Sequence, residues 1–214
     1  FGYAKTVDVS VYERNKEAAD TENRYILTCK NTDKICIFTN KGQMHLLKVL
    51  DLPYGKFRDK GIPIDNLSNY DSSEENFIYI INLGAIIHSR LLFGTRTAML
   101  KMVDGSEFDV AKRTTASTKL NEDDELLIVH AMTGEETVVM QSEKEMFLRI
   151  EASTIPEKKK GAVGVRGMKL NAGDALSNIY VLDGENEQTV EVKGKEVVLN
   201  RLRVGNRDTK GTKR

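Results

Sequence analysis

Short apolar runs recur along the chain and are separated by polar turns. Residues 35–38, 91–93 and 137–140 are three such runs, and a turn rich in glycine, lysine or polar residues follows each one. Such runs, rich in β-branched and aromatic residues, are typical of buried strands joined in hairpins. No segment has a long apolar period of 3.6 residues. The pattern predicts an all-β protein, with at most a turn or two of helix at 15–20, inside a polar loop at 15–22.

The hairpins return with a period of about 50 residues, which is a signature of blade or solenoid repeats. We place the repeat units at about 35–83, 84–134 and 135–184, and a fourth hairpin opens at Thr189. In each unit the second strand carries a basic residue, in the order Lys48, Lys101, Arg149 and Arg201. A basic loop follows each second strand. A leucine closes the unit at an equal distance from each loop, at Leu67, Leu120 and Leu170.

One sheet of about four short strands cannot cover both of its apolar faces, so neighbouring units must stack. We therefore expect residues 1–214 to form one domain, a propeller-like disk of about four to five blades. Residues 1–34 and 185–214 are partial units, and joining these two ends would close the disk. The alternative is an unrelated β-sandwich with accidental internal similarity. The shared register of the basic residues and leucines argues against that alternative.

Three stretches resemble a known family and follow one another in the order of the repeat. They are residues 38–42 running into 47–49, residues 60–67 and residues 164–174. These stretches resemble the C-terminal β-pinwheel of the A subunits of bacterial gyrase and topoisomerase IV, and the resemblance covers essentially the whole chain. It implies blades with exchanged strands and a basic outer rim that binds and bends duplex DNA.

The resemblance also implies partners and a division of labour. The strand-cutting tyrosine of the family lies in an upstream cleavage–religation domain of the same subunit, so this domain is expected to be a non-catalytic accessory. The ATPase subunit, that upstream domain and duplex DNA are the expected partners. Gyrase-type domains carry a box of glutamine, two arginines and a glycine-rich basic tail in the first blade. No stretch here matches it, so the chain is more similar to a topoisomerase IV type, or to a gyrase relative with weakened wrapping.

Basic loops that recur once per unit would place cations along one rim, where they can meet the phosphates of a duplex. The candidate DNA-binding residues are Lys56, Arg58, Lys60, Lys112, Arg113, Lys158, Lys159, Lys160, Arg166 and Lys169, with Lys48, Lys101, Arg149 and Arg201 as weaker candidates. A glycine beside the cations, as at Gly61 and Gly161, would let the backbone approach a phosphate. The alternative is that these residues are solvated loop charges and outward-facing strand residues.

Composition narrows the picture only slightly. The chain has 32 basic and 32 acidic residues, which excludes a uniformly positive surface and leaves room for a basic rim on an acidic body. Two cysteines without a CxxC pair and three histidines far apart indicate neither a zinc site nor a disulfide framework. We also find no nucleophile elbow, no HExxH motif and no GxGxxG spacing at 161–167. No catalytic residue, metal or cofactor is therefore expected.

No apolar stretch approaches the length of a membrane-spanning helix, and the first residues lack the layout of a signal peptide. A cytoplasmic location and no membrane partner are expected by default. The sequence leaves a second function open, which is a protein-interaction disk that does not wrap DNA. An independent enzyme has no supporting motif.

Overall fold

Three four-stranded antiparallel sheets form the body of the molecule, as seen in the computed structural model, which describes residues 2–214. The first blade consists of β2 (Lys34–Thr39), β3 (Gln43–Lys48), β5 (Phe77–Asn82) and β8 (Thr114–Ala116). The second consists of β6 (Arg90–Thr95), β7 (Met99–Asp104), β9 (Leu126–Met132) and β12 (Val165–Arg166). The third consists of β10 (Thr137–Ser142), β11 (Met146–Glu151), β13 (Leu176–Leu182) and β16 (Thr212–Lys213).

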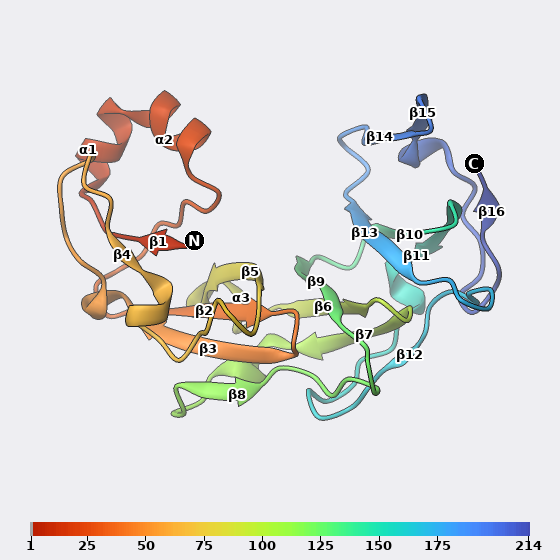
Figure 1. The fold of residues 1–214 in the computed structure, drawn as a ribbon, viewed down its shortest axis with the longest axis horizontal. Helices are drawn as coiled ribbons and strands as arrows, with labels where there is room; N and C mark the ends of the chain where they lie inside the picture. Colours follow the sequence, from red (N-terminus) through yellow and green to blue (C-terminus); the bar gives the residue numbers. More distant parts are fainter. Residues whose placement is uncertain (1) are drawn as a thin grey trace.

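The outermost strand of every blade comes from the following repeat. In chain order β8 follows β7, yet it pairs with β3 of the preceding blade. In the same way β12 pairs with β7, and β16 pairs with β11. The other edge of each sheet is the strand that returns within the same unit, namely β5, β9 or β13. Figure 1 shows these returning strands toward the inside of the molecule and the exchanged strands on its outside. The prediction of an all-β fold with exchanged strands is confirmed.

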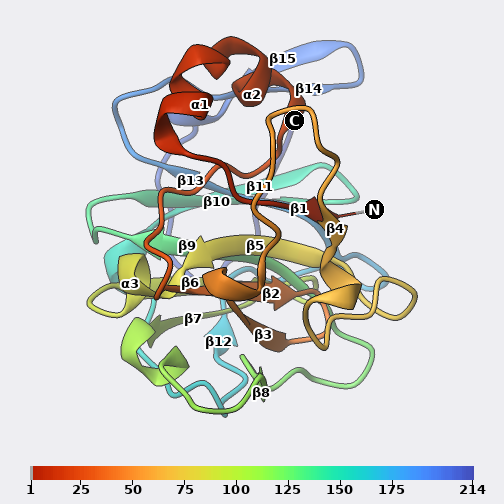
Figure 2. The ribbon, with the colours of Figure 1, turned by 90° about the vertical axis from the view of Figure 1, so that its left-hand side faces the viewer.

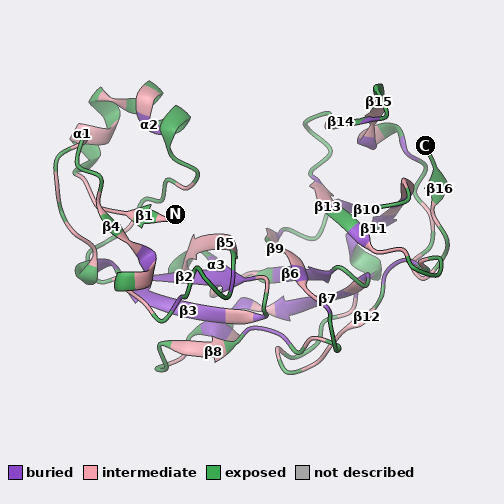
Figure 3. Cartoon of the chain, in the orientation of Figure 1, coloured by how far each residue is buried: buried purple, intermediate pink, exposed green. Residues whose placement is uncertain are grey.

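The blades repeat in detail as well as in outline. Each pairing of a first strand with its returning strand shifts register at the same place, after Phe38, after Gly94 and after Gln141. A bulge of this kind bends the strand and increases its twist. Apolar side chains from neighbouring blades then meet, and separate clusters fill the spaces between successive units. Figure 3 shows the buried residues concentrated in the central strands of the blades.

The two ends carry smaller units. At the N-terminal end β1 (Tyr3–Ala4) pairs with β4 (Ile62–Pro63), and at the C-terminal end β14 (Thr189–Val192) pairs with β15 (Lys195–Val198). The sequence led us to expect that the ends close the disk. Across residues 2–214, however, no strand of one end pairs with a strand of the other. Figure 1 shows the blades along an arc, with the two end units apart.

Helices are short and few. The turn or two of helix expected at 15–20 is present as α2 (Lys16–Glu22), and a further helix that the sequence did not lead us to expect, α1 (Val9–Arg14), precedes it. Lysine, glutamate and two alanines are good helix formers, and Ala19 is buried, so propensity and packing both favour the helix. A third helix, α3 (Leu83–Ile86), follows β5. Figure 2 shows α1 and α2 at one extreme of the molecule and β8 at the opposite one.

Single 3-10 turns follow the second strand of each unit or lead out of an exchanged strand. They are η1 (Val49–Asp51), η2 (Ile64–Asn66), η3 (Gly105–Phe108), η4 (Ala152–Thr154) and η5 (Leu199–Arg201). Within residues 2–214 no helix is long and apolar enough to cross a membrane. The turns matter for function because each loop that leads to an exchanged strand begins at one of them.

Candidate nucleic-acid interface

Four loops at the outer edge connect the 3-10 turns to the exchanged strands, and we call them the rim loops. They are residues 53–61, 109–113, 156–164 and 203–211. Each rim loop passes beside the second strand of the preceding unit. Parallel bridges join Thr6 to Tyr54, Met102 to Glu157 and Arg149 to Val204, and the amide of Leu46 donates to the carbonyl of Arg113. The fold therefore repeats the same loop position along the outside of the arc.

The rim loops concentrate positive charge. Together they hold eleven basic and four acidic residues, whereas the whole chain holds 32 of each. The rest of the molecule consequently carries a net negative charge. This distribution matches the basic rim on an acidic body that the balanced composition left open.

The first rim loop presents all three of its predicted cations to solvent. Lys56, Arg58 and Lys60 are exposed. The ammonium of Lys60 lies 4.3 Å from the centre of the Tyr3 ring, an arrangement that fixes the side chain without removing its charge. In the second rim loop Lys112 and Arg113 are exposed as well.

The third rim loop divides its lysines between solvent and the protein. Lys158 and Lys159 are exposed, whereas Lys160 is half-buried and donates 3.0 Å to the backbone oxygen of Glu107. That contact joins the loop to η3 of the preceding unit. Lys158 and Lys159 are therefore the two lysines of this loop that are free to meet a ligand.

Arg166 and Lys169 lie beside the fourth rim loop rather than in the third. Arg166 forms an ion pair with Asp208, and the 2.5 Å contact raises the pKa of the guanidinium and lowers the pKa of the carboxyl. The amide of Lys169 donates to the carbonyl of Thr209. Both side chains are exposed. The third and fourth units thus meet at a shared basic edge.

The weaker candidates on the second strands do not occupy equivalent positions. Lys48 is exposed at the end of β3, and Arg201 is exposed in η5 with Glu187 at 3.2 Å. Arg149 is half-buried and donates to the backbone oxygens of Asn200 and Leu202.

The structure contradicts the prediction that Lys101 is a DNA-binding residue. Its side chain is 1% exposed, and its ammonium donates to three backbone oxygens, so it cannot reach a phosphate on the surface. The assumed register failed because Lys48 is the last residue of β3 whereas Lys101 is the third residue of β7, and adjacent residues of a strand point to opposite faces.

Two glycines of the rim loops have a steric role within the fold, beside the phosphate approach that the sequence suggested for Gly61 and Gly161. Gly164 has a φ of +105°, and a Cβ there would lie 2.6 Å from the backbone oxygen of Leu100. Gly61 has a φ of +83° and approaches the backbone of Ala4 in the same way. Both let the loop press against the preceding unit as the exchanged strand begins. Gly161 has open space around it and a negative or extended φ, so nothing in the structure requires glycine there.

From the sequence, we did not select any residue of the fourth rim loop as a candidate for DNA binding. That loop contains Arg203, Arg207 and Lys210, of which Arg203 and Lys210 are exposed. Its basic composition was visible in the repeat, but the loop lies in a partial unit. The structure gives it the same position as the others, since Val204 bridges Arg149 just as Glu157 bridges Met102.

Among residues 2–214 no group of three or more His, Cys, Asp or Glu side chains is placed to hold a metal ion. Both cysteines are free thiols, and burial raises the pKa of Cys36 to about 12. His45 is buried and lies 2.5 Å from Glu75 within the first blade.

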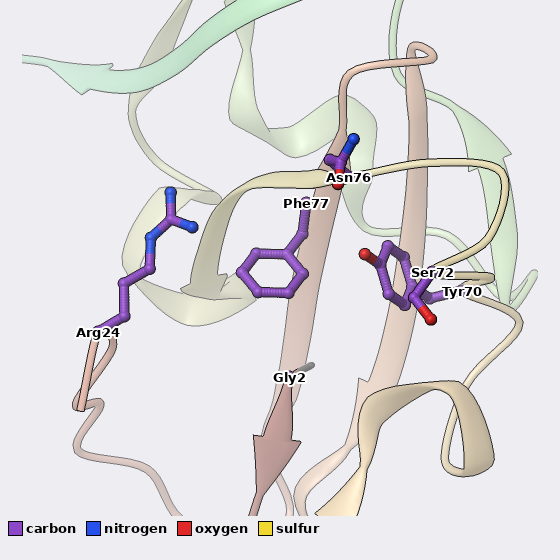
Figure 4. A pocket seen from close by; sticks show the side chains of 6 residues that line it. All are labelled: Gly2, Arg24, Tyr70, Ser72, Asn76 and Phe77. Carbon is purple, nitrogen blue, oxygen red and sulfur yellow. The ribbon is translucent and has the colours of Figure 1, made fainter. Parts of the chain in front are cut away.

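One cavity of about 280 Å³ lies between the N-terminal unit and the first blade. It is lined by Gly2, Arg24, Tyr70, Ser72, Asn76 and Phe77, as Figure 4 shows. The Arg24 guanidinium lies over the rings of Tyr25 and Phe77, 5.4 and 5.5 Å from their centres. Arg24 is the one charged side chain that lines this cavity.

Stacked four-stranded sheets with exchanged outer strands and a cationic rim define a β-pinwheel. A family model described as "DNA gyrase C-terminal domain, beta-propeller" matches residues 89–131 and 136–183, which correspond closely to the second and third repeat units of the sequence. The A subunit of DNA gyrase from Staphylococcus epidermidis is 30% identical over 196 residues, which are 88% of this chain and 22% of that protein. The A subunit of DNA gyrase from Lawsonia intracellularis is 28% identical over 229 residues, 98% of this chain and 28% of that protein.

Solved structures agree on the fold. The C-terminal domain of a DNA topoisomerase IV superposes with a TM-score of 0.86 and 22% identity, over 99% of this chain and 69% of that one. The C-terminal domain of E. coli ParC superposes with a TM-score of 0.72 and 14% identity, over 87% of this chain and 78% of that one. The resemblance to the C-terminal domains of gyrase and topoisomerase IV A subunits, and the β-pinwheel fold, are thus confirmed. The chain spans about a quarter of the length of its curated gyrase relatives.

Proposed function

We propose that this domain binds duplex DNA along its outer rim, as the non-catalytic accessory domain of a type IIA topoisomerase A subunit of the gyrase or topoisomerase IV type. The observation that carries the proposal is the repeated position of the rim loops, which gather basic side chains from successive units on one edge of an otherwise acidic molecule. A duplex presents phosphates continuously along its length, so a series of cationic loops can neutralise several at once.

The proposed contacts are to the backbone and not to the bases. Exposed lysines and arginines on loops neutralise phosphates without reading sequence, and base readout requires an element that enters a groove. The described strands are short and paired within their sheets, which suits binding without sequence preference. As the accessory part of a larger enzyme, the domain would orient DNA for an upstream cleavage–religation domain that works with an ATPase subunit in the cytoplasm.

Binding to a fluorescent duplex of about 40 base pairs at low salt, measured by anisotropy, tests the proposal. We expect salt-sensitive binding that weakens about tenfold when Lys158 and Lys159 are both replaced by Gln, because each phosphate contact supplies part of the affinity. The matched control replaces Lys16 and Lys30 by Gln. Those lysines are also exposed, but they lie outside the rim loops, so the control should bind like the parent. No binding by the parent chain would refute the proposal.

A protein-interaction surface is the second candidate, and one observation favours it. Large apolar side chains are exposed in the N-terminal part, with Val9 at 62%, Leu50 at 68% and Tyr54 at 69%. Aromatic and aliphatic side chains of this kind often anchor protein partners. Nuclease-resistant capture of the upstream topoisomerase core by the chain, abolished in a Leu50→Ser, Tyr54→Ser variant, would support this second function.

A further inference from the structure

Two lysines on different strands hold rim loops in the same way. The ammonium of Lys101 donates to the backbone oxygens of Lys159, Lys160 and Ala162, at 3.1, 3.0 and 2.6 Å. The ammonium of Lys5 donates to the backbone oxygens of Lys56, Phe57 and Asp59. In both loops the acceptors occupy the first, second and fourth positions of a four-residue segment.

The correspondence extends to the neighbouring residues. Lys5 follows Ala4, which pairs with Ile62, and Lys101 follows Leu100, which pairs with Val165. The glycine that precedes each paired residue, Gly61 or Gly164, has a positive φ and presses on the backbone of that same Ala4 or Leu100. Each ammonium also lies over a phenylalanine ring, at 5.5 Å from Phe57 for Lys5 and 5.6 Å from Phe93 for Lys101.

Such a contact bends the loop around the ammonium. Three carbonyl oxygens that converge on one cation point inward, so the intervening side chains of the loop are directed away from it. Exposed cations of the same loops, Lys56 and Arg58 in the first and Lys158 and Lys159 in the third, then face solvent. Holding them in place before binding reduces the conformational entropy that a ligand must remove.

Stability alone does not explain a buried ammonium. A buried charge is expensive to desolvate, and an apolar residue of similar size often serves stability as well or better. Burial lowers the pKa of Lys101 to about 8, partly offset by Glu107, so the fold disfavours the charged form that makes these contacts. A role in shaping the loop accounts for the cation where packing does not.

We propose that Lys5 and Lys101 are positioning residues that arrange the first and third rim loops for phosphate contact without touching DNA themselves. The proposal rests on the DNA-binding function above and extends it to residues that lie beneath the rim. It assigns each lysine to one loop, which makes the two sites controls for each other.

Double-mutant cycles on duplex affinity test this assignment. Lys101→Met keeps the length of the side chain and removes the three donated hydrogen bonds. We expect it to weaken binding about threefold or more, and to have no further effect when Lys158 and Lys159 are already Gln. In a background with Lys56 and Arg58 replaced by Gln, Lys101→Met should retain its full effect. Lys5→Met should behave in the opposite way. It should have no further effect when Lys56 and Arg58 are already Gln, and its full effect when Lys158 and Lys159 are Gln.

A general loss of structure would give another pattern, because it would weaken binding equally in both backgrounds. That result, or no effect of either variant, would overturn the proposal. If Lys101→Met fails to fold by circular dichroism, the Lys5→Met cycle decides the matter, since Lys5 lies in the smaller N-terminal unit.

A second measurement separates this proposal from the proposed function. Trypsin cleaves after exposed lysine and arginine when the backbone is free to open. Lys101→Met should accelerate cleavage after 158–160 and leave the rate after 56–60 unchanged, and Lys5→Met should do the reverse. If the parent chain binds no DNA but the cleavage rates change in this crossed manner, the DNA-binding function fails and the positioning role stands. Unchanged cleavage in both variants would remove the positioning role.

Discussion

At the scale of single residues, the ammonium of Lys101 is satisfied by backbone dipoles rather than by a carboxylate. Within the described chain, 2–214, no ion pair includes Lys101, although Glu107 is close enough to raise its pKa. Burial has the larger effect and lowers the pKa to about 8. An unfolded lysine has a pKa near its ordinary value of about 10.4. The native and unfolded states therefore bind different numbers of protons between these two values.

This difference predicts the pH dependence of stability. Above a pH of about 8 the native state loses the Lys101 proton while the unfolded state keeps it, so the free energy of unfolding rises with pH up to about 10.4. Urea unfolding of the parent and of Lys101→Met at pH 7 and 9.5 measures the effect, because other titrating groups cancel in the difference. The parent should gain about 2 kcal/mol relative to the variant between the two pH values. An unchanged difference would mean that the ammonium is not desolvated.

At the scale of elements, exchanged strands of two or three residues need anchors beyond their own pairing. In the first blade, His45 of β3 is such an anchor for β8. Its Nδ1 lies 2.9 Å from the hydroxyl of Thr114 in β8. Its Nε2 lies 2.5 Å from Glu75, and the side-chain amide of Asn69 donates to the same Thr114 hydroxyl at 3.0 Å. The imidazole thereby connects a loop of its own blade to a strand from the next unit.

Removing the carboxylate should weaken this anchor. Glu75→Ala leaves the Nε2 atom of buried His45 without its partner, and an unsatisfied buried polar group costs about 1–3 kcal/mol. The free energy of unfolding should fall by that amount, and the amides of β8 should exchange faster with deuterium. Glu74→Ala is the matched control, because Glu74 is exposed next to it and should change stability by less than about 0.5 kcal/mol. Equal effects of the two substitutions would argue that the pair does not anchor β8.

The same scale shows what the sequence alone can predict. Hairpins such as β2–β3 and β10–β11 were predictable, because apolar runs and turn residues are local signals. The exchanged strands were not predictable from pattern, since two or three residues show no periodicity, and only the family resemblance implied them. The exposed cations of the rim loops were predictable, because each of these loops is rich in lysine and arginine. The buried state of Lys101 did not, because it depends on a loop about 60 residues further along the chain that folds over it.

At the scale of the whole molecule, the arc distributes the rim loops around its outside, so the proposed binding should depend on how many loops a duplex can reach. A duplex long enough to follow the arc can meet several loops, whereas a short one meets few. A domain of this length has a radius of gyration of roughly 17 Å. The path around its rim is therefore longer than a duplex of about 12 base pairs, which measures roughly 40 Å.

Length dependence of the salt effect follows from this geometry. Each phosphate neutralised contributes about −0.9 to the slope of log affinity against log salt. A duplex of about 40 base pairs should give a slope more negative by about 2 or more than a duplex of about 12 base pairs, because loops from additional units take part. Anisotropy titrations at several salt concentrations measure both slopes. Replacing Lys158 and Lys159 by Gln should reduce the slope for the long duplex by up to about 2, which is roughly one for each phosphate that is no longer neutralised. Identical slopes for the two lengths would show that a single loop accounts for binding, and the cooperation of loops around the rim would have to be abandoned.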